Sequence, residues 1–235
     1  MHVTERRTIK VYDLWSRLYD RTFGFVAQKR QKCAMAQLPL KAGDRVLDLG
    51  VGTGMTMPLY PRDVKVIGMD LSLGMLTLAA AKHQAMKLDH CLLVQGDAMA
   101  PPFAAASFDH VLISHTIGVV SDPVGVLRLA ARLVRPGGRI VVLNHFQSSR
   151  PFVAAVENAL NPVCRRIGWR SNLPLESLLR GPDLDLEYCF QIRLADLWKI
   201  AVLRRTVGHR ASKVPSGSVR FEDDTVVALQ ETFAA

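Results

Sequence analysis

A glycine-rich turn directly after an apolar run constrains this chain more than any other feature. The segment Asp48-Leu49-Gly50-Val51-Gly52-Thr53-Gly54 follows a predicted strand over Arg45–Leu49. Its glycines allow a sharp turn and a close approach of backbone to a ligand. A dinucleotide site requires G-x-G-x-x-G with a small third residue, whereas position 55 is Met, which disfavours hydride transfer. Asp48 beside the loop suits a ligand that carries an ammonium and a sulfonium group.

Short apolar runs alternate with helical stretches after this loop. Strands are predicted over Arg45–Leu49, Val64–Asp70, Cys91–Gln95, Phe108–Ser114 and Arg139–Asn144, and over Leu184–Arg193 and Leu197–Arg204 late in the chain. One helix is capped by Ser72 and ends near Lys87, and another begins at Asp122-Pro123 and stops at Arg135-Pro136-Gly137-Gly138. This alternation predicts a parallel sheet with right-handed crossovers.

Carboxylates follow the second and third predicted strands. Asp70 can accept hydrogen bonds from two ribose hydroxyls, or it can serve as a charge at the start of the next helix. Asp97 can accept from an adenine amino group, with Ala98 or Met99 near the ring, or it can be a turn aspartate. The fourth strand would end at the reactive group of the ligand with Ser114 and His115, whereas Asp109 braces that strand.

Together, these motifs resemble those of class I S-adenosylmethionine (SAM)-dependent methyltransferases over residues 40–145. The segment Leu133–Gly138 completes the set. The resemblance implies an α/β fold with a Rossmann-like, seven-stranded, mostly parallel sheet, helices on both faces, an N-terminal helical extension and a C-terminal antiparallel hairpin. It also implies SAM as cofactor and S-adenosylhomocysteine as product. The implied cofactor-binding residues are Asp48, Gly50, Gly52, Gly54, Asp70, Leu71, Asp97, Ala98, Ser114 and Tyr19.

Residues on either side of this core indicate which molecule accepts the methyl group. Tyr12, Trp15 and Tyr19 share one helical face, which either packs on the core or covers the cofactor as a lid. Asn144-His145-Phe146 and Gly168-Trp169-Arg170 resemble the soluble-type bacterial phospholipid N-methyltransferases, which convert phosphatidylethanolamine to phosphatidylcholine. The N-terminal aromatic pattern also occurs in quinone-biosynthesis C-methyltransferases, so a quinone or another small-molecule acceptor is the alternative.

Several side chains are candidates for the acceptor chemistry. His115, His145 or the hydroxyl of Tyr19 can orient the amine or accept its proton, although either histidine can also be an ordinary polar residue at a loop edge. The candidates that would hold the substrate act by cation–π contact, by hydrogen bonding or by pairing with phosphate. They are Tyr12, Tyr19, Trp169, Asn144, Arg150, Arg165, Arg166 and Arg170, and some of the arginines can simply be surface residues.

The net charge of +9 over 235 residues favours an anionic partner or reflects a solvated basic surface. Nucleic acid is not expected as a substrate, because Ser114-His115-Thr116-Ile117 stands where an amine-methylating enzyme of that class carries N-P-P-Y/F. A catalytically silent SAM-fold protein that binds nucleic acid or membrane is disfavoured by the intact loop with Asp70 and Asp97. The four cysteines lack metal or disulfide spacing, so no metal is expected.

Three regions are predicted along the chain. Residues 1–40 form a helical lid or membrane-contacting segment, residues 41–208 the methyltransferase domain with a substrate-side insertion at 150–182, and residues 209–235 a tail. Residues 1–37 carry eight basic against three acidic side chains, and their apolar positions recur at mostly helical spacing. An amphipathic helix of this kind lies on an anionic membrane. We therefore expect a cytoplasmic protein bound peripherally to the inner face of the membrane, and the oligomeric state is left open.

Overall fold

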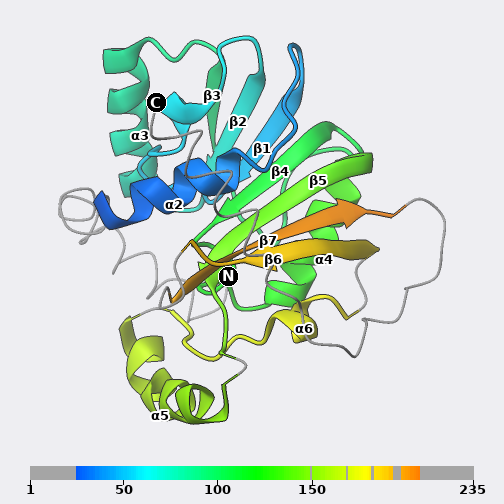
Figure 1. Cartoon of the computed structure of the whole chain (residues 1–235). Coiled ribbons are helices and arrows are strands. Elements are labelled where there is room, and N and C mark those ends of the chain that lie inside the picture. The colour runs from blue at the N-terminus through cyan, green and yellow to red at the C-terminus, as the bar shows by residue number, and fades with distance from the viewer. Residues whose placement is uncertain (1–24, 149, 168, 181–182, 193–196, 207–235) are drawn as a thin grey trace.

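The computed structural model describes residues 25–148, 150–167, 169–180, 183–192 and 197–206. Seven strands form one sheet in the order β3-β2-β1-β4-β5-β7-β6 (Figure 1). The pairs within β1 to β5 are parallel, whereas β7 runs antiparallel to both β5 and β6. The predicted mostly parallel sheet with a C-terminal antiparallel pair is therefore confirmed.

The elements alternate along the chain as the sequence predicts. The strands are β1 Arg45–Leu49, β2 Lys65–Asp70, β3 Cys91–Gln95, β4 Phe108–Ser114, β5 Val134–His145, β6 Leu184–Phe190 and β7 Trp198–Arg205. The helices are α2 Phe25–Met35, α3 Leu73–Met86, α4 Pro123–Leu133, α5 Pro151–Ile167 and α6 Leu175–Leu178, and a short 3-10 turn, η2, spans Met57–Leu59.

Strand β5 differs most from its prediction, because it begins at Val134 and includes the segment expected to end the preceding helix. Val134 has extended dihedral angles and pairs with Phe108, and the register shifts before His110 pairs with Arg139. Gly138 makes this path possible, since a Cβ there would overlap the backbone carbonyl of Asp109. Pro-Gly-Gly, interpreted as a helix stop, is thus an irregular stretch of strand.

Helices cover both faces of the sheet. Alternate residues of the strands supply two separate apolar layers: Val111 and Ile113 of β4 pack on the α4 and α6 side, whereas Leu112 packs on the α2 and α3 side. Every residue of β4 is buried, as expected for a strand covered on both faces. The two layers hold the sheet rigidly, so the loops at its carboxyl edge have fixed starting points.

The predicted caps set the ends of two helices. The hydroxyl oxygen of Ser72 accepts a hydrogen bond from Met75 N at the start of α3, and Asp122 accepts one from Gly125 N at the start of α4. Each bond satisfies an N–H group that has no partner within its own helix. These are the two helices that immediately follow the candidate site loops after β2 and β4.

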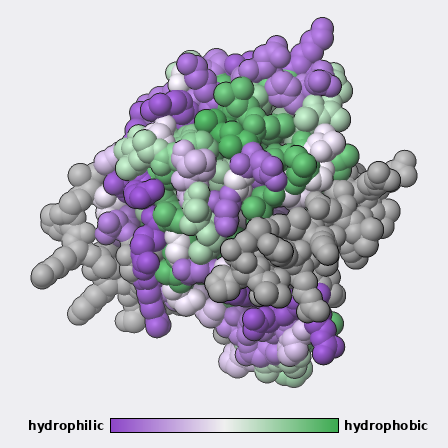
Figure 2. Space-filling model, turned by 180° about the vertical axis from the view of Figure 1, so that it is seen from behind, coloured by the Kyte–Doolittle hydropathy of each residue, from purple (hydrophilic) through white to green (hydrophobic). Residues whose placement is uncertain are grey.

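The insertion at 150–182 contains α5 and α6. Figure 1 shows α5 as an arm that extends away from the sheet, and the opposite view shows its lobe with hydrophilic and hydrophobic surface side by side (Figure 2). Of the predicted N-terminal extension, only α2 and the residues after it are described. Residues 1–24 and 207–235, which include Tyr12, Tyr19 and the predicted tail, lie outside the described residues.

Candidate active site

The candidate site lies where the strand order reverses beside β1. Strands β2 and β4 flank β1, and parallel strands bring their carboxyl ends to one edge. The crevice at such a reversal is the usual ligand site of open α/β sheets. Antiparallel β7 adds its first residue to this edge, because Trp198 pairs with His145 at the end of β5.

The glycine loop is attached to the end of β2. Gly50 N and Val51 N both donate to Met69 O, over 2.7 and 3.0 Å. Gly50 has φ +80°, and a Cβ there would overlap the hydroxyl of Thr116, so only glycine fits. Gly52 also has a positive φ, of +56°, but a Cβ there would meet nothing within 4 Å. The loop therefore packs tightly at Gly50 and is open above Gly52.

Asp48 lies beneath the loop and not at its open side. Its carboxylate is fully buried, and Oδ2 accepts hydrogen bonds from Thr56 Oγ1 at 2.5 Å and Tyr60 OH at 3.1 Å. Burial raises the pKa of Asp48 from its usual value near 3.8 to about 6. Asp48 therefore braces the loop from beneath through Oδ2, and its contact with a ligand ammonium stays a prediction. The motif analysis missed Thr56 and Tyr60, which are polar residues among apolar neighbours in η2 and its flanks.

Asp70 joins the glycine loop to the helix after it. Its Oδ2 accepts from Gly52 N at 2.8 Å, and its Oδ1 accepts from Ser72 N at 2.9 Å. The carboxylate therefore braces the start of α3, as one of the two sequence interpretations predicts, and the ribose contact stays a prediction.

The predicted adenine side is formed after β3. Asp97 is half-buried, and its Oδ1 accepts from Met99 N at 2.8 Å, which closes a local turn. Ala98 and Met99 are half-buried against the core. Leu71, also half-buried, follows Asp70, and its carbonyl accepts a bond from Gln95 Nε2 at 3.3 Å. These residues lie together at the carboxyl ends of β2 and β3, as the sequence predicted.

A second group of side chains lies across the edge, at the ends of β4 and β7. His115 has φ +58°, a left-handed conformation that costs energy for a residue with a side chain. Its ring stands edge-on to Trp198 with 6.2 Å between ring centroids, and the guanidinium carbon of Arg30 lies 4.5 Å from the centroid of the Trp198 ring. Strained backbone of this kind is concentrated at functional sites.

Helix α2 contributes a polar residue that sequence reasoning missed. Gln31 is buried, and its amide donates to the Ser114 hydroxyl over 3.4 Å, a long contact. A signal was present in the sequence, because Ala27, Gln31 and Ala34 share one helical face on which Gln31 is the only polar member. Position 31 thus brings an amide to the predicted reactive end of the site.

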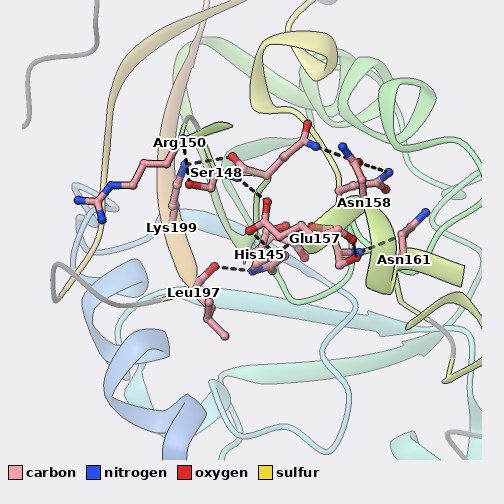
Figure 3. A network of polar contacts seen from close by, with 12 residues as sticks. His145, Ser148, Arg150, Glu157, Asn158, Asn161, Leu197 and Lys199 are labelled. Atoms are coloured by element: carbon pink, nitrogen blue, oxygen red, sulfur yellow. Dashed lines mark hydrogen bonds and ion pairs between the residues drawn. The ribbon is translucent and has the colours of Figure 1, made fainter. Parts of the chain in front are cut away.

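His145, expected as a possible base, is buried in a different polar cluster (Figure 3). Its Nδ1 lies 2.6 Å from Leu197 O, and its Nε2 lies 2.9 Å from Ser171 O. The carboxylate of Glu157 lies 3.4 Å from Nε2 as well. Both ring nitrogens therefore face protein oxygens, so His145 supports the packing of the insertion here, and its role as a base stays a prediction.

The residues beside His145 are also occupied with internal contacts. The ring of Trp169 stands edge-on to the His145 ring with 5.5 Å between centroids, Asn144 Nδ2 donates to His145 O at 2.7 Å, and Arg170 Nη2 donates to Ser121 O at 3.0 Å. The Trp169 contact holds the insertion on β5, the Asn144 contact lies within β5, and the Arg170 contact joins the insertion to the loop after β4. The substrate roles of these three residues stay predictions. Arg150 is exposed, and its side chain lies at the surface.

Asp109 stands at the opposite edge of the sheet, as a brace. Its Oδ2 accepts from Arg45 N at 2.6 Å, and its Oδ1 pairs with the guanidinium of Arg135. The Asp109 carboxylate therefore ties β1, β4 and the start of β5 together. The prediction that Asp109 supports the strand is confirmed.

Comparison with known proteins indicates the same chemistry as the motifs. A family model described as a methyltransferase domain matches residues 47–142. A phosphatidylethanolamine N-methyltransferase of Cereibacter sphaeroides is 36% identical over 176 residues, which cover 74% of this chain and 86% of that protein. A demethylmenaquinone methyltransferase of Oceanobacillus iheyensis is 32% identical over 163 residues, which cover 66% of this chain and 67% of that protein.

Solved structures share the fold at low sequence identity. A possible histamine N-methyltransferase from Thermotoga maritima is 20% identical, with a TM-score of 0.66, over 84% of this chain and 99% of that one. The [4+2]-cyclase SpnF is 18% identical, with a TM-score of 0.71, over 85% of this chain and 95% of that one. Because a cyclase has the same fold, the fold alone does not specify methyl transfer.

Proposed function

Because this chain belongs to the SAM-dependent methyltransferases, we propose that it methylates the amine of phosphatidylethanolamine and its mono- and dimethyl forms, producing phosphatidylcholine and S-adenosylhomocysteine. The observation that carries the proposal is the 36% identity to a phosphatidylethanolamine N-methyltransferase over 86% of that protein's length. The match extends beyond the residues of the methyltransferase domain, since 74% of this chain is included.

The residues at the edge of β1, β2 and β3 fit SAM. A Cβ at Gly52 would point into open space above the loop, so the backbone there can come close to a ligand. The Asp70 carboxylate, which Gly52 N and Ser72 N hold at the end of β2, would accept from the ribose hydroxyls, and Asp97 would accept from the adenine amino group. When bound, SAM supplies a methyl group made electrophilic by the sulfonium.

The acceptor amine must lose a proton before it can attack, because the first substrate carries an ammonium at neutral pH. His115 is half-exposed at the end of β4, beside Ser114, and we assign it the task of orienting the amine and accepting that proton. Gln31 and Ser114 supply an amide and a hydroxyl that can fix the direction of the nitrogen lone pair. Such positioning is the principal contribution of a protein to a displacement of this kind.

Arg30 is suited to the phosphate of the same substrate. Its guanidinium lies over the Trp198 ring, whose edge meets His115, so a phosphate held there would stand close to the amine. Guanidinium groups bind phosphate through two parallel N–H donors. The exposed Arg150, Arg165 and Arg166 stay candidates for longer-range attraction of an anionic surface.

Methylation of defined acceptors tests the proposal. Purified protein is incubated with SAM labelled on its methyl group and with phosphatidylethanolamine or demethylmenaquinone, and the products are separated by thin-layer chromatography. Label in mono-, di- or trimethylated lipid is the expected result. Label in the quinone alone would replace the proposal with carbon methylation.

That second function has its own support, because the demethylmenaquinone methyltransferase of Oceanobacillus iheyensis is 32% identical over 163 residues. Its acceptor is a ring carbon, which becomes nucleophilic when a neighbouring hydroxyl is deprotonated. His115 could remove that proton as well, so the catalytic side chains alone do not separate the two acceptors. The extent of the matches favours the lipid, since 86% of the phospholipid enzyme is covered against 67% of the quinone enzyme.

We further propose that the protein works in the cytoplasm, at the inner face of the membrane. The basic surplus of residues 1–37 supports this location, but most of those residues lie outside the described ones. The described part of that segment, α2, packs Ala27, Gln31 and Ala34 toward the sheet. The membrane-binding part would therefore have to lie within residues 1–24 or elsewhere on the surface.

A further inference from the structure

Helix α5 turns polar residues toward the protein and large apolar side chains toward the solvent, whereas an ordinary surface helix does the opposite. The side that faces the protein carries polar residues at its centre: Glu157 is buried and Asn161 is half-buried, with the half-buried Val153, Ala154 and Cys164 beside them. Glu157 Oε2 accepts from Ser148 N at 2.8 Å, and Asn161 Oδ1 accepts from Ser171 N at 3.3 Å. Polar contacts therefore contribute to the attachment of the helix, and the large apolar side chains of its outward side take no part in it.

The outward side of α5 is apolar. Phe152, Val156, Leu160 and Val163 follow one another at steps of four, four and three residues, which places them in one stripe along the helix. All four are exposed, Phe152 by 82% and Leu160 by 52%. Single exposed apolar residues are common, but a continuous stripe on a projecting helix indicates an interaction surface.

The charge of this surface points to an anionic partner. Arg150 precedes the helix, and Arg165 and Arg166 lie in its last turns, all three exposed. The one acidic residue between positions 150 and 170 is Glu157, and it is turned inward against His145. An apolar stripe with arginines at both ends and no exposed acid has the chemistry of a helix that lies on anionic phospholipid.

The position of α5 connects this surface to the site. The helix begins six residues after His145, the last residue of β5, and so starts at the carboxyl edge where the candidate site lies. At 17 residues the helix is about 25 Å long, enough to rest along a membrane interface. Among the described residues, no helix combines the length and hydropathy needed to cross a bilayer.

We propose that α5 docks the protein on an anionic phospholipid surface, with its apolar stripe in the headgroup region and Arg150, Arg165 and Arg166 paired with lipid phosphates. This rests on the proposed function, in which a phospholipid headgroup must reach His115. The contact between His145 and Glu157 attaches α5 to the end of β5, so it would keep the membrane surface in a fixed orientation to the active site.

Flotation with vesicles tests the docking. The full-length protein is mixed with vesicles of phosphatidylcholine and phosphatidylglycerol, and in parallel with vesicles of phosphatidylcholine alone. The double variant Phe152→Ser/Leu160→Ser should lower binding to the anionic vesicles by about tenfold or more, and Arg165→Gln/Arg166→Gln by about tenfold with a weaker salt dependence. Leu92→Ser is the matched control, since Leu92 is 64% exposed on β3, and it should bind as the unmodified protein does.

Two further measurements separate the outcomes. SAM binding, measured by calorimetry, should be equal in all variants and shows that each is folded. Methylation of a short-chain, water-soluble phosphatidylethanolamine should persist in the α5 variants, while methylation of vesicle lipid falls. If the unmodified protein floats but methylates no phospholipid, the docking stands and the proposed function fails.

Two results would overturn the docking of α5 on the membrane. Equal flotation of the α5 variants, with binding lost only when residues 1–24 are deleted, would overturn the docking by α5 and leave lipid methylation intact. An apolar stripe that instead joins two copies would appear in sedimentation as a dimer of the unmodified protein that Phe152→Ser/Leu160→Ser dissociates, without vesicle binding. That result would also overturn the proposal.

Discussion

The two halves of the sheet's carboxyl edge are built by different means. At the ends of β1, β2 and β3, most of the contacts involve backbone groups. Gly50 N and Val51 N donate to one carbonyl, and the Asp70 carboxylate accepts from two backbone N–H groups. At the ends of β5 and β7, side chains distant in sequence meet: His145 binds the carbonyls of Ser171 and Leu197, 26 and 52 residues away. The first half, the cofactor half, is held by contacts between neighbouring loops and strand ends. The second, the acceptor half, is held by contacts between segments that are distant in the sequence.

This difference indicates how each half tolerates change. A loop held by its own backbone binds an invariant ligand, and any added atom at Gly50 disturbs it directly. A cluster such as His145, Glu157 and Ser171 positions an arm through its inward side, so the outer surface of α5 can change without disturbing the attachment. We therefore expect changes in one half to leave the other largely unaffected.

Substitution of Gly50 should produce the largest effect. Gly50→Ala forces a side chain into φ +80° and into the volume of the Thr116 hydroxyl. The strain and the overlap together amount to about 3 kcal/mol, so SAM affinity should fall by about a hundredfold in calorimetry. Gly50→Ala combined with Thr116→Ala should recover part of the loss, because it removes the overlaps with Oγ1 and Cγ2 of Thr116 and leaves the overlap with its Cβ and the strain. Unchanged affinity in the single variant would contradict the tight packing of the loop.

Removing the charge of Glu157 should destabilise only the acceptor half of the edge, that is, the half formed at the ends of β5 and β7. Glu157→Gln replaces a buried carboxylate that contacts His145 Nε2 and accepts from Ser148 N, and the weakening of these contacts should cost about 3 kcal/mol. Hydrogen exchange of the α5 amides should accelerate accordingly, while SAM affinity stays within about twofold. Asn158→Ala, on the exposed side of the same helix, is the control and should cost about 1 kcal/mol or less. A large loss of SAM affinity in Glu157→Gln would show that the two halves are coupled.

The brace beneath the glycine loop should give a pH-dependent stability. Burial raises the pKa of Asp48 in the folded state to about 6, from about 3.8. Between these two pKa values, the folded state binds more protons than the unfolded state. Protonated Asp48 therefore stabilises the folded state fully below about pH 3.8, and this stabilisation is lost as the pH rises through about 6. Between about pH 4.5 and 7.5, the free energy of unfolding should fall by about 2 kcal/mol relative to that of Asp48→Asn. Parallel urea-unfolding profiles of the two proteins would refute this assignment.

The smallest expected effect concerns the ribose contact. Asp70→Asn keeps the size of the side chain but weakens the bonds it accepts from a ligand, from Gly52 N and from Ser72 N. Replacing a carboxylate acceptor by a neutral amide weakens the hydrogen bonds to the ligand by about 1.4 kcal/mol. SAM affinity should therefore fall by about tenfold. Asp122→Asn, at the cap of α4, serves as a matched control and should bind SAM normally. Calorimetry that finds wild-type affinity in Asp70→Asn would remove Asp70 from the cofactor site.

The cofactor half could be predicted from the sequence because its geometry is local. The glycines with positive φ, the Ser72 cap and the carboxylates after β2 and β3 depend on neighbours within a few residues, so their spacing carries the information. Strands β1, β3 and β4 begin and end where their apolar runs do. Even here, burial assigned Asp48 to the underside of the loop, which spacing alone does not distinguish from the ligand side.

The acceptor half was decided by tertiary structure. His145 was interpreted as a possible base and Trp169 as a substrate residue, because polar and aromatic side chains near a strand end suit either a ligand or an internal contact. Only the folded chain brings Ser171 and Leu197 to the two nitrogens of His145 and so engages both of them in internal contacts. Gln31 and Trp198 reach the edge for the same reason, since α2 and antiparallel β7 close on β4 and β5 from opposite ends of the sequence. Local spacing determined where the cofactor loop turns, and long-range packing determined which side chains face the acceptor.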